Sequence, residues 1–239
     1  MIDIFYFYPT IFFASFISTI GGYGTGALVM ATGLMFFDAK EILGITTLVF
    51  LTNNITKLAL FRKHIDLKIS KTFILWSVPA AVLGASLTIY IPAKGIQLGL
   101  GGMIVVYLLI KYLKIGSKLK VTQPVIRVAS ILYGLITSLT GTGGIIKAAV
   151  FIEVGLVKEA FIGTFALTSM FVNITKLIIY SNYQYINSSN LEVALTAIVF
   201  CISGIFLGKY VLKKFISDKI FEYLVTALLG FSAAKLLFF

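Results

Sequence analysis

Two Gly-Thr-Gly triplets, at residues 24–26 and 141–143, have the residue types and spacing expected of an anion-binding turn. Each triplet joins two short apolar runs, so a helix starting after it would present unpaired N–H groups and the positive end of its dipole. Glycine lets the backbone approach a ligand, and threonine can donate a hydrogen bond or cap the helix. The alternative is a close helix-packing surface, for which small residues are common in membranes. The turn residues predicted to bind the anion are Gly22, Gly24, Thr25, Gly26, Gly141, Thr142, Gly143 and Gly144.

A second pair of candidate segments has the sequence Asn-Ile-Thr-Lys-Leu, at residues 54–58 and 173–177. Within each segment the Asn and the Lys share a helix face, so they can present an amide and an ammonium to one anion. The residues predicted to bind substrate here are Asn54, Lys57, Asn173 and Lys176. Lys57 could instead extend to the cytoplasmic interface, because it lies about one turn before Arg62. Lys176 has no such neighbour, since the loop that follows it carries no charge.

Lys147 and Glu153 lie in an otherwise apolar stretch without ionisable counterparts in the first half of the chain. A carboxylate inside a membrane suggests proton coupling, and this is the role predicted for Glu153. It could instead form a structural ion pair or lie near an interface, and its spacing from Lys147 does not place the two on one helix face. Weaker candidates for lining the same cavity are Thr46, Thr47, Thr164 and Lys147. Threonine hydroxyls in membrane helices often bond to their own backbone instead.

The composition excludes a soluble fold. Hydrophobic residues make up 59% of the 239 residues and charged residues 12%, against about 25% charged in soluble domains. The net charge of +11 comes from short basic clusters between apolar runs, which indicates membrane topology and contacts to anionic lipid rather than nucleic acid. With one Cys and one His, the sequence lacks the parts of a zinc site or a Ser-His pair, so we expect no metal, cofactor or catalytic residue.

The apolar segments fall into two sets of five. They cover residues 5–20, 26–37, 42–61, 70–91 and 95–113, then 125–139, 144–157, 160–180, 191–212 and 220–239. The first two segments of each set are short for a membrane span, which needs about 20 residues, and they meet at a glycine cluster. We therefore expect each pair to form a hairpin that enters the membrane and turns back.

The same motifs recur in the same order in both halves. The offset rises only from 117 residues for Gly-Thr-Gly to 119 for Asn-Ile-Thr-Lys-Leu, and Lys-Glu and a following glycine recur between them. Ordered recurrence of this kind predicts an internal repeat. The predicted organisation is a first inverted repeat over 1–114, a cytoplasmic linker over 115–124 and a second inverted repeat over 125–239.

The basic residues predict the orientation. They gather in three regions, whose members are Arg62, Lys63, Lys68 and Lys71; Lys111, Lys114, Lys118, Lys120 and Arg127; and Lys209, Lys213, Lys214 and Lys219. The positive-inside rule places these regions in the cytoplasm. The loop at 181–190, which is equivalent to the first of them, has no charge. Equivalent loops are thus expected on opposite sides of the cytoplasmic (inner) membrane, with both termini outside.

Several of these features resemble the TauE/SafE-like sulfite exporter family, also called the toluene-sulfonate uptake permease family. The similarity lies in the glycine turn of each half, in Gly163-Thr164 after Lys158-Glu159-Ala160, and in Gly84 and Gly204 of the fourth segments. The resemblance implies transport of sulfite, sulfoacetate or another sulfonate, with proton coupling as an option. The glycine turns depart from the family pattern, which commonly has a longer glycine run followed by a proline. This departure bears on the substrate more than on the fold.

The sequence thus predicts an all-α, polytopic secondary transporter of a small anion, in which two inverted halves alternate access to a central site. Its expected partners are the anion and the lipid bilayer, and a homodimer is left open as its oligomeric state. An anion channel on the same scaffold is the nearest alternative. A membrane enzyme lacks a paired acid and base in its apolar segments, and a structural subunit would leave the repeated motifs without a purpose.

Overall fold

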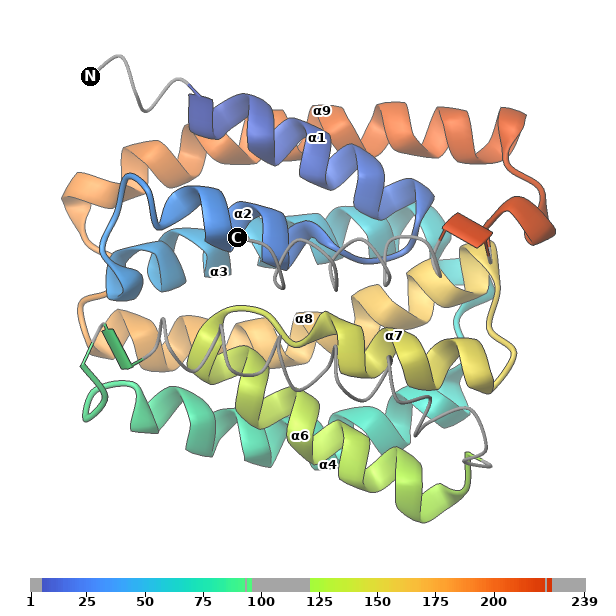
Figure 1. Ribbon diagram of the computed structural model, residues 1–239, viewed down its shortest axis with the longest axis horizontal. Helices are drawn as coiled ribbons and strands as arrows, with labels where there is room; N and C mark the ends of the chain where they lie inside the picture. Colours follow the sequence, from blue (N-terminus) through green and yellow to red (C-terminus); the bar gives the residue numbers. More distant parts are fainter. Residues whose placement is uncertain (1–5, 93, 96–120, 222, 225–239) are drawn as a thin grey trace.

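The computed structural model describes residues 6–92, 94–95, 121–221 and 223–224, and the secondary structure of this part of the chain is helical (Figure 1). Its first helices are α1 (Phe7–Ile20), α2 (Thr25–Gly33), α3 (Ala39–Phe61), the short 3-10 helix η2 (Arg62–His64) and α4 (Leu67–Leu87). After the undescribed residues come α6 (Gln123–Thr140), α7 (Gly144–Glu153), α8 (Lys158–Asn182) and α9 (Ser188–Phe215). These helices coincide with the predicted apolar segments, apart from 95–113 and 220–239, which lie largely outside the described residues.

Four of the described helices are long and apolar enough to cross a membrane, namely α3 extended by η2, α4, α8 and α9. A span needs about 20 residues, because a helix rises about 1.5 Å per residue through about 30 Å of hydrocarbon. The second and seventh helices are much shorter, with 9 residues in α2 and 10 in α7. The chain is therefore a multi-pass, all-helical membrane protein that also contains half-length helices, as the sequence predicted.

Polar residues fix where the long helices begin. Asp38 and Glu41 form a capping box at the start of α3, and the Asp66 side chain accepts a hydrogen bond from the backbone N–H of Ile69 at 2.9 Å at the start of α4. Asn187 caps α9 in the same way, by accepting from Ser189 and Asn190. Each cap satisfies N–H groups that would otherwise lack a partner.

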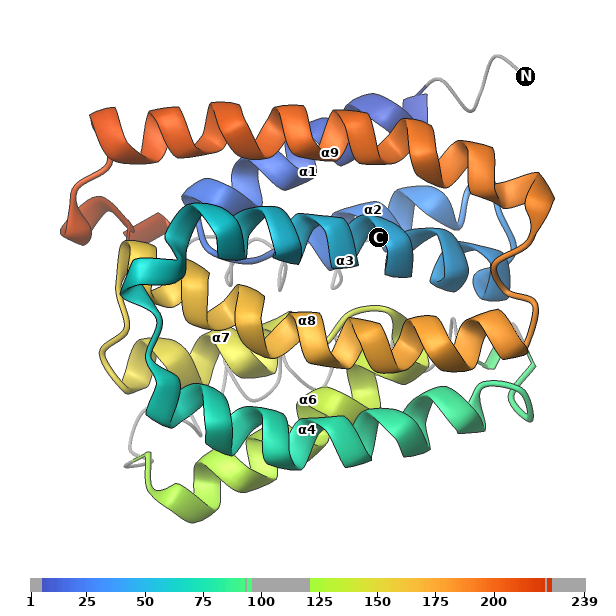
Figure 2. The same ribbon diagram turned by 180° about the vertical axis from the view of Figure 1, so that it is seen from behind.

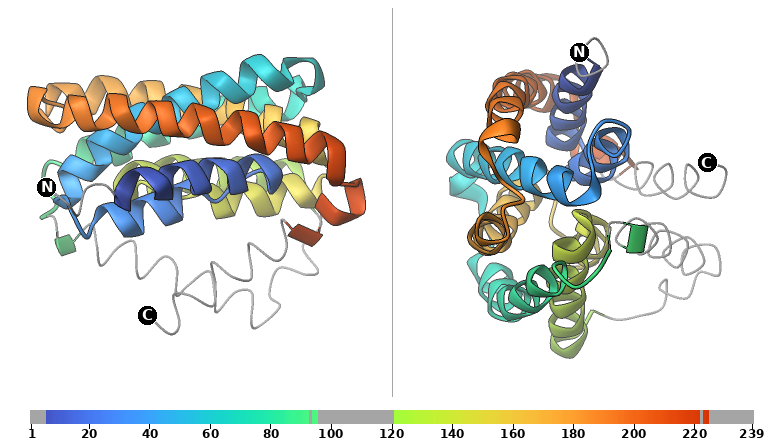
Figure 3. Two further views of the ribbon diagram at one scale, coloured as in Figure 1. Left: turned by 90° about the horizontal axis from the view of Figure 1, so that it is seen from above. Right: turned by 90° about the vertical axis from the view of Figure 1, so that its left-hand side faces the viewer.

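The centre of the molecule is the pair α3 and α8, which pack against each other (Figures 1 and 2). On one side α9 covers α3 and carries α1, and on the other side α4 covers α8 and carries α6. Figure 3 shows the long helices running along a common axis. The packing leaves both short helices, α2 and α7, beside the central pair, where they can close a site between the two sides.

Two glycines allow the outer pairs to approach closely. A Cβ on Gly84 of α4 would lie 2.5 Å from the carbonyl oxygen of Leu135 in α6, and a Cβ on Gly204 of α9 would lie 2.3 Å from that of Phe12 in α1. Both distances are too short for any side chain. These glycines, which contributed to the family resemblance, therefore serve helix packing.

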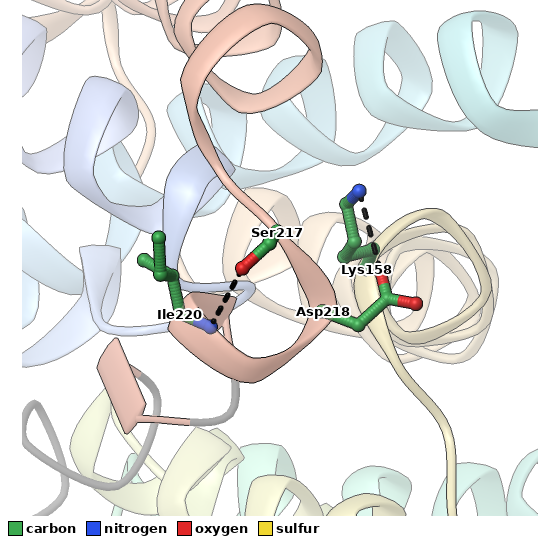
Figure 4. A network of polar contacts seen from close by, with 4 residues as sticks. All are labelled: Lys158, Ser217, Asp218 and Ile220. Carbon is green, nitrogen blue, oxygen red and sulfur yellow. Dashed lines mark hydrogen bonds and ion pairs between the residues drawn. The ribbon is translucent and has the colours of Figure 1, made fainter.

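Most of the described basic loop residues lie at one end of the bundle. The end of α3, the beginning of α6 and the end of α9 lie at this end, whereas the loops at 34–38 and 183–187 lie at the opposite end (Figure 1). Lys158, at the start of α8, forms an ion pair with Asp218 at 3.2 Å at this basic end (Figure 4). The predicted basic residues Lys111, Lys114, Lys118 and Lys120 lie outside the described residues.

Candidate functional site

The two glycine turns, which are more than a hundred residues apart in the sequence, contact each other. A Cβ on Gly26 would lie 3.2 Å from the carbonyl oxygen of Gly141 and 3.5 Å from Thr142 Oγ1. Gly141 ends α6 with φ of +76°, and a Cβ there would lie 2.5 Å from Met30 Sδ. Position 141 therefore requires glycine, because its φ is positive and because Met30 leaves no room for a Cβ. The structure thus brings together two motifs that the sequence showed only as a repeat.

Both short helices begin at this contact. Gly24 is the N-cap of α2 and has φ of 111°, and Gly143 is the N-cap of α7. Neither cap supplies a side-chain acceptor to the first-turn N–H groups. Two helix N-termini with uncapped N–H groups therefore begin at the same place, and both favour negative charge there.

A cavity of about 80 Å³ lies between the two turns and the central helices. Its lining residues are Gly22, Tyr23, Gly24, Thr25, Gly26, Phe50, Asn53, Asn54, Lys57, Tyr133, Thr137, Gly141, Thr142, Gly143, Gly144, Ile145, Ile162, Phe165, Ala166, Ser169 and Asn173. One water needs about 10–15 Å³ on this measure, so the cavity has room for a small ligand of a few heavy atoms. All eight predicted turn residues lie in this lining, together with three of the four from the repeated pentapeptides.

The α3 wall of the cavity carries a buried lysine. Lys57 is 4% exposed and donates a hydrogen bond to Ser18 Oγ of α1 at 2.9 Å. Beside it, Asn53 donates to Ser15 Oγ at 3.3 Å and contacts Cys201 Sγ at 3.4 Å. Among the described residues no carboxylate pairs with Lys57. The side chain thus points into the protein at the cavity and does not extend to the interface.

Asn54 lies on the same wall and is 7% exposed. Within the described part of the chain, its side-chain amide has no hydrogen-bond partner. A buried polar group without a partner costs free energy, so an amide left free beside a cavity is suited to a ligand. Asn54 and Lys57 therefore present the pair of groups that their spacing predicted.

The α8 wall places its lysine differently. Asn173 lines the cavity, and its Oδ1 accepts a hydrogen bond from Lys176 Nζ at 3.4 Å. Lys176 itself is fully buried outside the cavity lining, with its ammonium 5.7 Å from the centre of the Tyr180 ring. The second lysine therefore lies behind the lining and is joined to it by a hydrogen bond to Asn173.

The weaker candidates lie around the cavity rather than in its lining. Thr46 donates to the carbonyl oxygen of Ile42 at 2.6 Å, Thr47 donates to that of Leu43 at 2.7 Å, and Thr164 Oγ1 accepts from the backbone N–H of Asp66 at 2.9 Å. Lys147 is fully buried on α7, behind the lining. Glu153 ends α7 with an exposed side chain and is not part of the cavity.

Sequence reasoning did not identify several polar lining residues, namely Asn53, Tyr133, Thr137 and Ser169. Ser169 had a usable signal, because it stands four positions before Asn173 and seven before Lys176 on one face of α8. Tyr133 and Thr137 are four positions apart on α6 and likewise share a face. The prediction relied on repeated motifs, and these residues have no repeat.

The lining is rich in hydrogen-bond donors. It combines the side chain of Lys57, the amides of Asn54 and Asn173, several hydroxyls and the backbone N–H groups at the starts of α2 and α7. It contains no Asp or Glu. No group of three His, Cys, Asp or Glu residues that could hold a metal occurs within the described ranges. Chemically, the site suits the binding of an acceptor such as an oxyanion.

Comparison with known proteins gives one match. The family model described as "Sulfite exporter TauE/SafE" matches residues 7–236, which is nearly the whole chain. No curated protein and no solved structure shows a significant match.

Proposed function

Since this chain belongs to the TauE/SafE sulfite exporter family, we propose that it carries sulfite or a sulfonate through the cavity between its two glycine turns. Family membership makes it a membrane transporter of sulfur-containing anions and not an enzyme. The proposal adds the place of binding and the residues. It rests above all on one observation, the buried side chain of Lys57 in a cavity whose lining has no carboxylate.

Charge balance supports an anion as the ligand. An isolated ammonium buried in protein loses its hydration, and a hydroxyl partner such as Ser18 replaces that loss only in part. An oxyanion in the cavity would supply the missing counter-charge and would also accept hydrogen bonds from the free amide of Asn54. The uncapped starts of α2 and α7 add to the same preference.

Alternating access of two inverted halves is the proposed mechanism. The packing supports it, because the contacts between helices recur when α1–α4 are matched in order with α6–α9. The contact between α1 and α9 then corresponds to the contact between α6 and α4, and the contact between α3 and α9 corresponds to the contact between α8 and α4. Gly44 of α3 lies against the backbone of Tyr185, just after α8, and Gly163 of α8 lies against the backbone of Phe61, at the end of α3. Rocking of such halves about a central site is a common transport mechanism.

The proposed orientation has the basic end of the bundle in the cytoplasm and the N-terminus outside. The exposed residues Arg62, Lys63, Lys68 and Arg127 support it, since cytoplasmic loops carry an excess of Lys and Arg. Both termini lie outside the described residues, and their location outside the cell stays a prediction, as does the homodimer.

Flux measurements test the proposal. The protein is reconstituted in liposomes, and the efflux of sulfite and of a sulfonate is measured with increasing substrate and with or without a proton gradient. We expect the flux to saturate as the substrate concentration rises, whereas the flux through a channel would not saturate over the same concentrations. Replacing Lys57 by Ala should lower the flux about tenfold or more, since a hydrogen bond to a charged group contributes about 1.5–3 kcal/mol.

Two further variants control for this result. Lys63→Ala removes an exposed lysine of η2, directly after α3, and should leave flux unchanged. The double variant with Lys57→Ala and Lys176→Ala should transport no better than Lys57→Ala alone. Wild-type flux in the double variant would disprove the assignment of the lysines.

A further inference from the structure

Lys147 is a fully buried lysine whose three hydrogen-bond donors all have oxygen partners. Its ammonium donates to the carbonyl oxygen of Phe165 at 3.1 Å, to Thr168 Oγ1 at 3.0 Å and to Ser169 Oγ. It also lies 4.2 Å from the centre of the Tyr133 ring. By the spacing of the glycine triplets, the equivalent position of the first half is Met30, which has no charge. The cation is therefore particular to the α7 side.

Ser169 connects this lysine to the cavity. Its hydroxyl receives the hydrogen bond from Lys147 and lies 3.0 Å from the Tyr133 hydroxyl, and both Ser169 and Tyr133 line the cavity. Lys147 itself does not line it. A ligand in the cavity would thus meet Ser169 with a positive charge directly behind it.

The hydrogen bond between Lys147 and Ser169 has a direction set by the ammonium, whereas either hydroxyl can donate in the contact between Tyr133 and Ser169. In its ammonium form Lys147 can only donate, so it occupies one of the two lone pairs of Ser169 Oγ. If Tyr133 donates to the other lone pair, the hydroxyl proton of Ser169 has no acceptor within this group of three. That proton is then available to an acceptor in the cavity.

We propose that Lys147 is a positioning residue for the transported anion: together with Tyr133 it directs the Ser169 O–H to an oxygen of the bound oxyanion. The inference rests on the proposed function of the cavity and deepens it. An oxyanion, which only accepts hydrogen bonds, can take the proton that Ser169 offers to the cavity. A ligand that donates a hydrogen bond at this place would require the Ser169 O–H to turn away. The α7 side thereby selects for oxyanions by hydrogen-bond direction in addition to charge.

Thr168 and Ser169 provide a matched pair for testing this role. Each accepts one hydrogen bond from the same ammonium, but only Ser169 lines the cavity. We would measure the binding of sulfite to the purified full-length protein by isothermal titration calorimetry, together with thermal unfolding. Ser169→Ala should weaken binding about tenfold, as for loss of one hydrogen bond to a charged group, whereas Thr168→Ala should leave the affinity within about twofold.

A double-variant cycle separates positioning from a direct effect of charge. Lys147→Met, which copies Met30, should weaken binding in the wild-type background and should add nothing further in the Ser169→Ala background. Tyr133→Phe should also weaken binding, and it keeps the measurement decisive if Lys147→Met does not fold. Equal affinities of the Ser169 and Thr168 variants, or additive losses in the cycle, would overturn the proposal. If the wild type binds neither sulfite nor a sulfonate, the proposed function fails, and the role of Lys147 fails with it.

Discussion

The wall formed by α2 and α3 and the wall formed by α7 and α8 present the same amide to the cavity but place their cations differently. Asn54 and Asn173 both line the cavity. On the first wall the ammonium of Lys57 is itself part of the lining, whereas on the second wall Lys176 lies behind Asn173 and Lys147 lies behind Ser169. One wall offers a charge directly, and the other offers neutral groups oriented by charges.

This difference shows how a repeat can give an asymmetric site. Asn and Lys recur at equal spacing, yet the contacts of each lysine depend on what surrounds it. Lys57 finds Ser18 of α1 beside the cavity, while Lys176 finds the amide of its own helix. A transported anion would therefore meet different chemistry on its two sides, even where the halves share their backbone plan.

The largest effects that could break this comparison are expected from the two amides. Asn54→Leu removes a free amide and should raise the KM for sulfite about tenfold without lowering the unfolding temperature. Asn173→Leu should raise KM to a similar degree and should also destabilise the protein by about 1–3 kcal/mol, because it leaves the buried Lys176 ammonium without its acceptor. Flux in liposomes and thermal unfolding in detergent give the two quantities.

Thr175→Val is the control for both amide variants, because Thr175 lies on α8 away from the cavity lining and bonds to its own helix. It should change neither KM nor the unfolding temperature appreciably. Equal stability of the two Asn variants would show that Lys176 does not depend on Asn173, and the contrast between the walls would then be lost.

The sequence predicted the helices and the turns well because their signals are local. Apolar length and glycine clusters placed α1 to α4 and α6 to α9 within a few residues, and the eight glycine-turn residues all proved to line one cavity. The family match confirmed the resemblance that Gly84, Gly204 and the turns had suggested.

The position of each lysine could not be predicted in the same way. Helix periodicity places Lys176 and Asn173 on one face, but it does not tell whether the ammonium enters the cavity or bonds to the amide. Likewise the spacing along α8 places Ser169 on the face of Asn173, but it does not show that α7 brings Lys147 against Ser169. Such contacts between helices depend on tertiary packing, which has no local signal.

A smaller effect is expected at Gly84 and Gly204, where the two sides of the molecule should behave alike. Gly84→Ala and Gly204→Ala each place a Cβ against a carbonyl oxygen of the neighbouring helix, so both should destabilise the protein by about 1–3 kcal/mol. Thermal unfolding would measure this loss. The control is Ser203→Ala, because Ser203 is exposed and stands directly before Gly204; it should have little effect. A clear loss for one glycine variant and none for the other would indicate that the α4 and α6 pair is not equivalent to the α1 and α9 pair.

The smallest effects are expected from the repeated lysines at the helix starts. Lys158 pairs with Asp218, whose side chain is 69% exposed, whereas the equivalent Lys40 contacts the carbonyl oxygen of Ile89 at 3.4 Å. Exposed ion pairs contribute about 0–1 kcal/mol and are screened by salt. Alanine at either position should therefore change the free energy of unfolding by less than about 1 kcal/mol, and only the effect at Lys158 should shrink in high salt. A salt-independent loss at Lys158 would mean that its contribution comes from packing at the start of α8 rather than from charge.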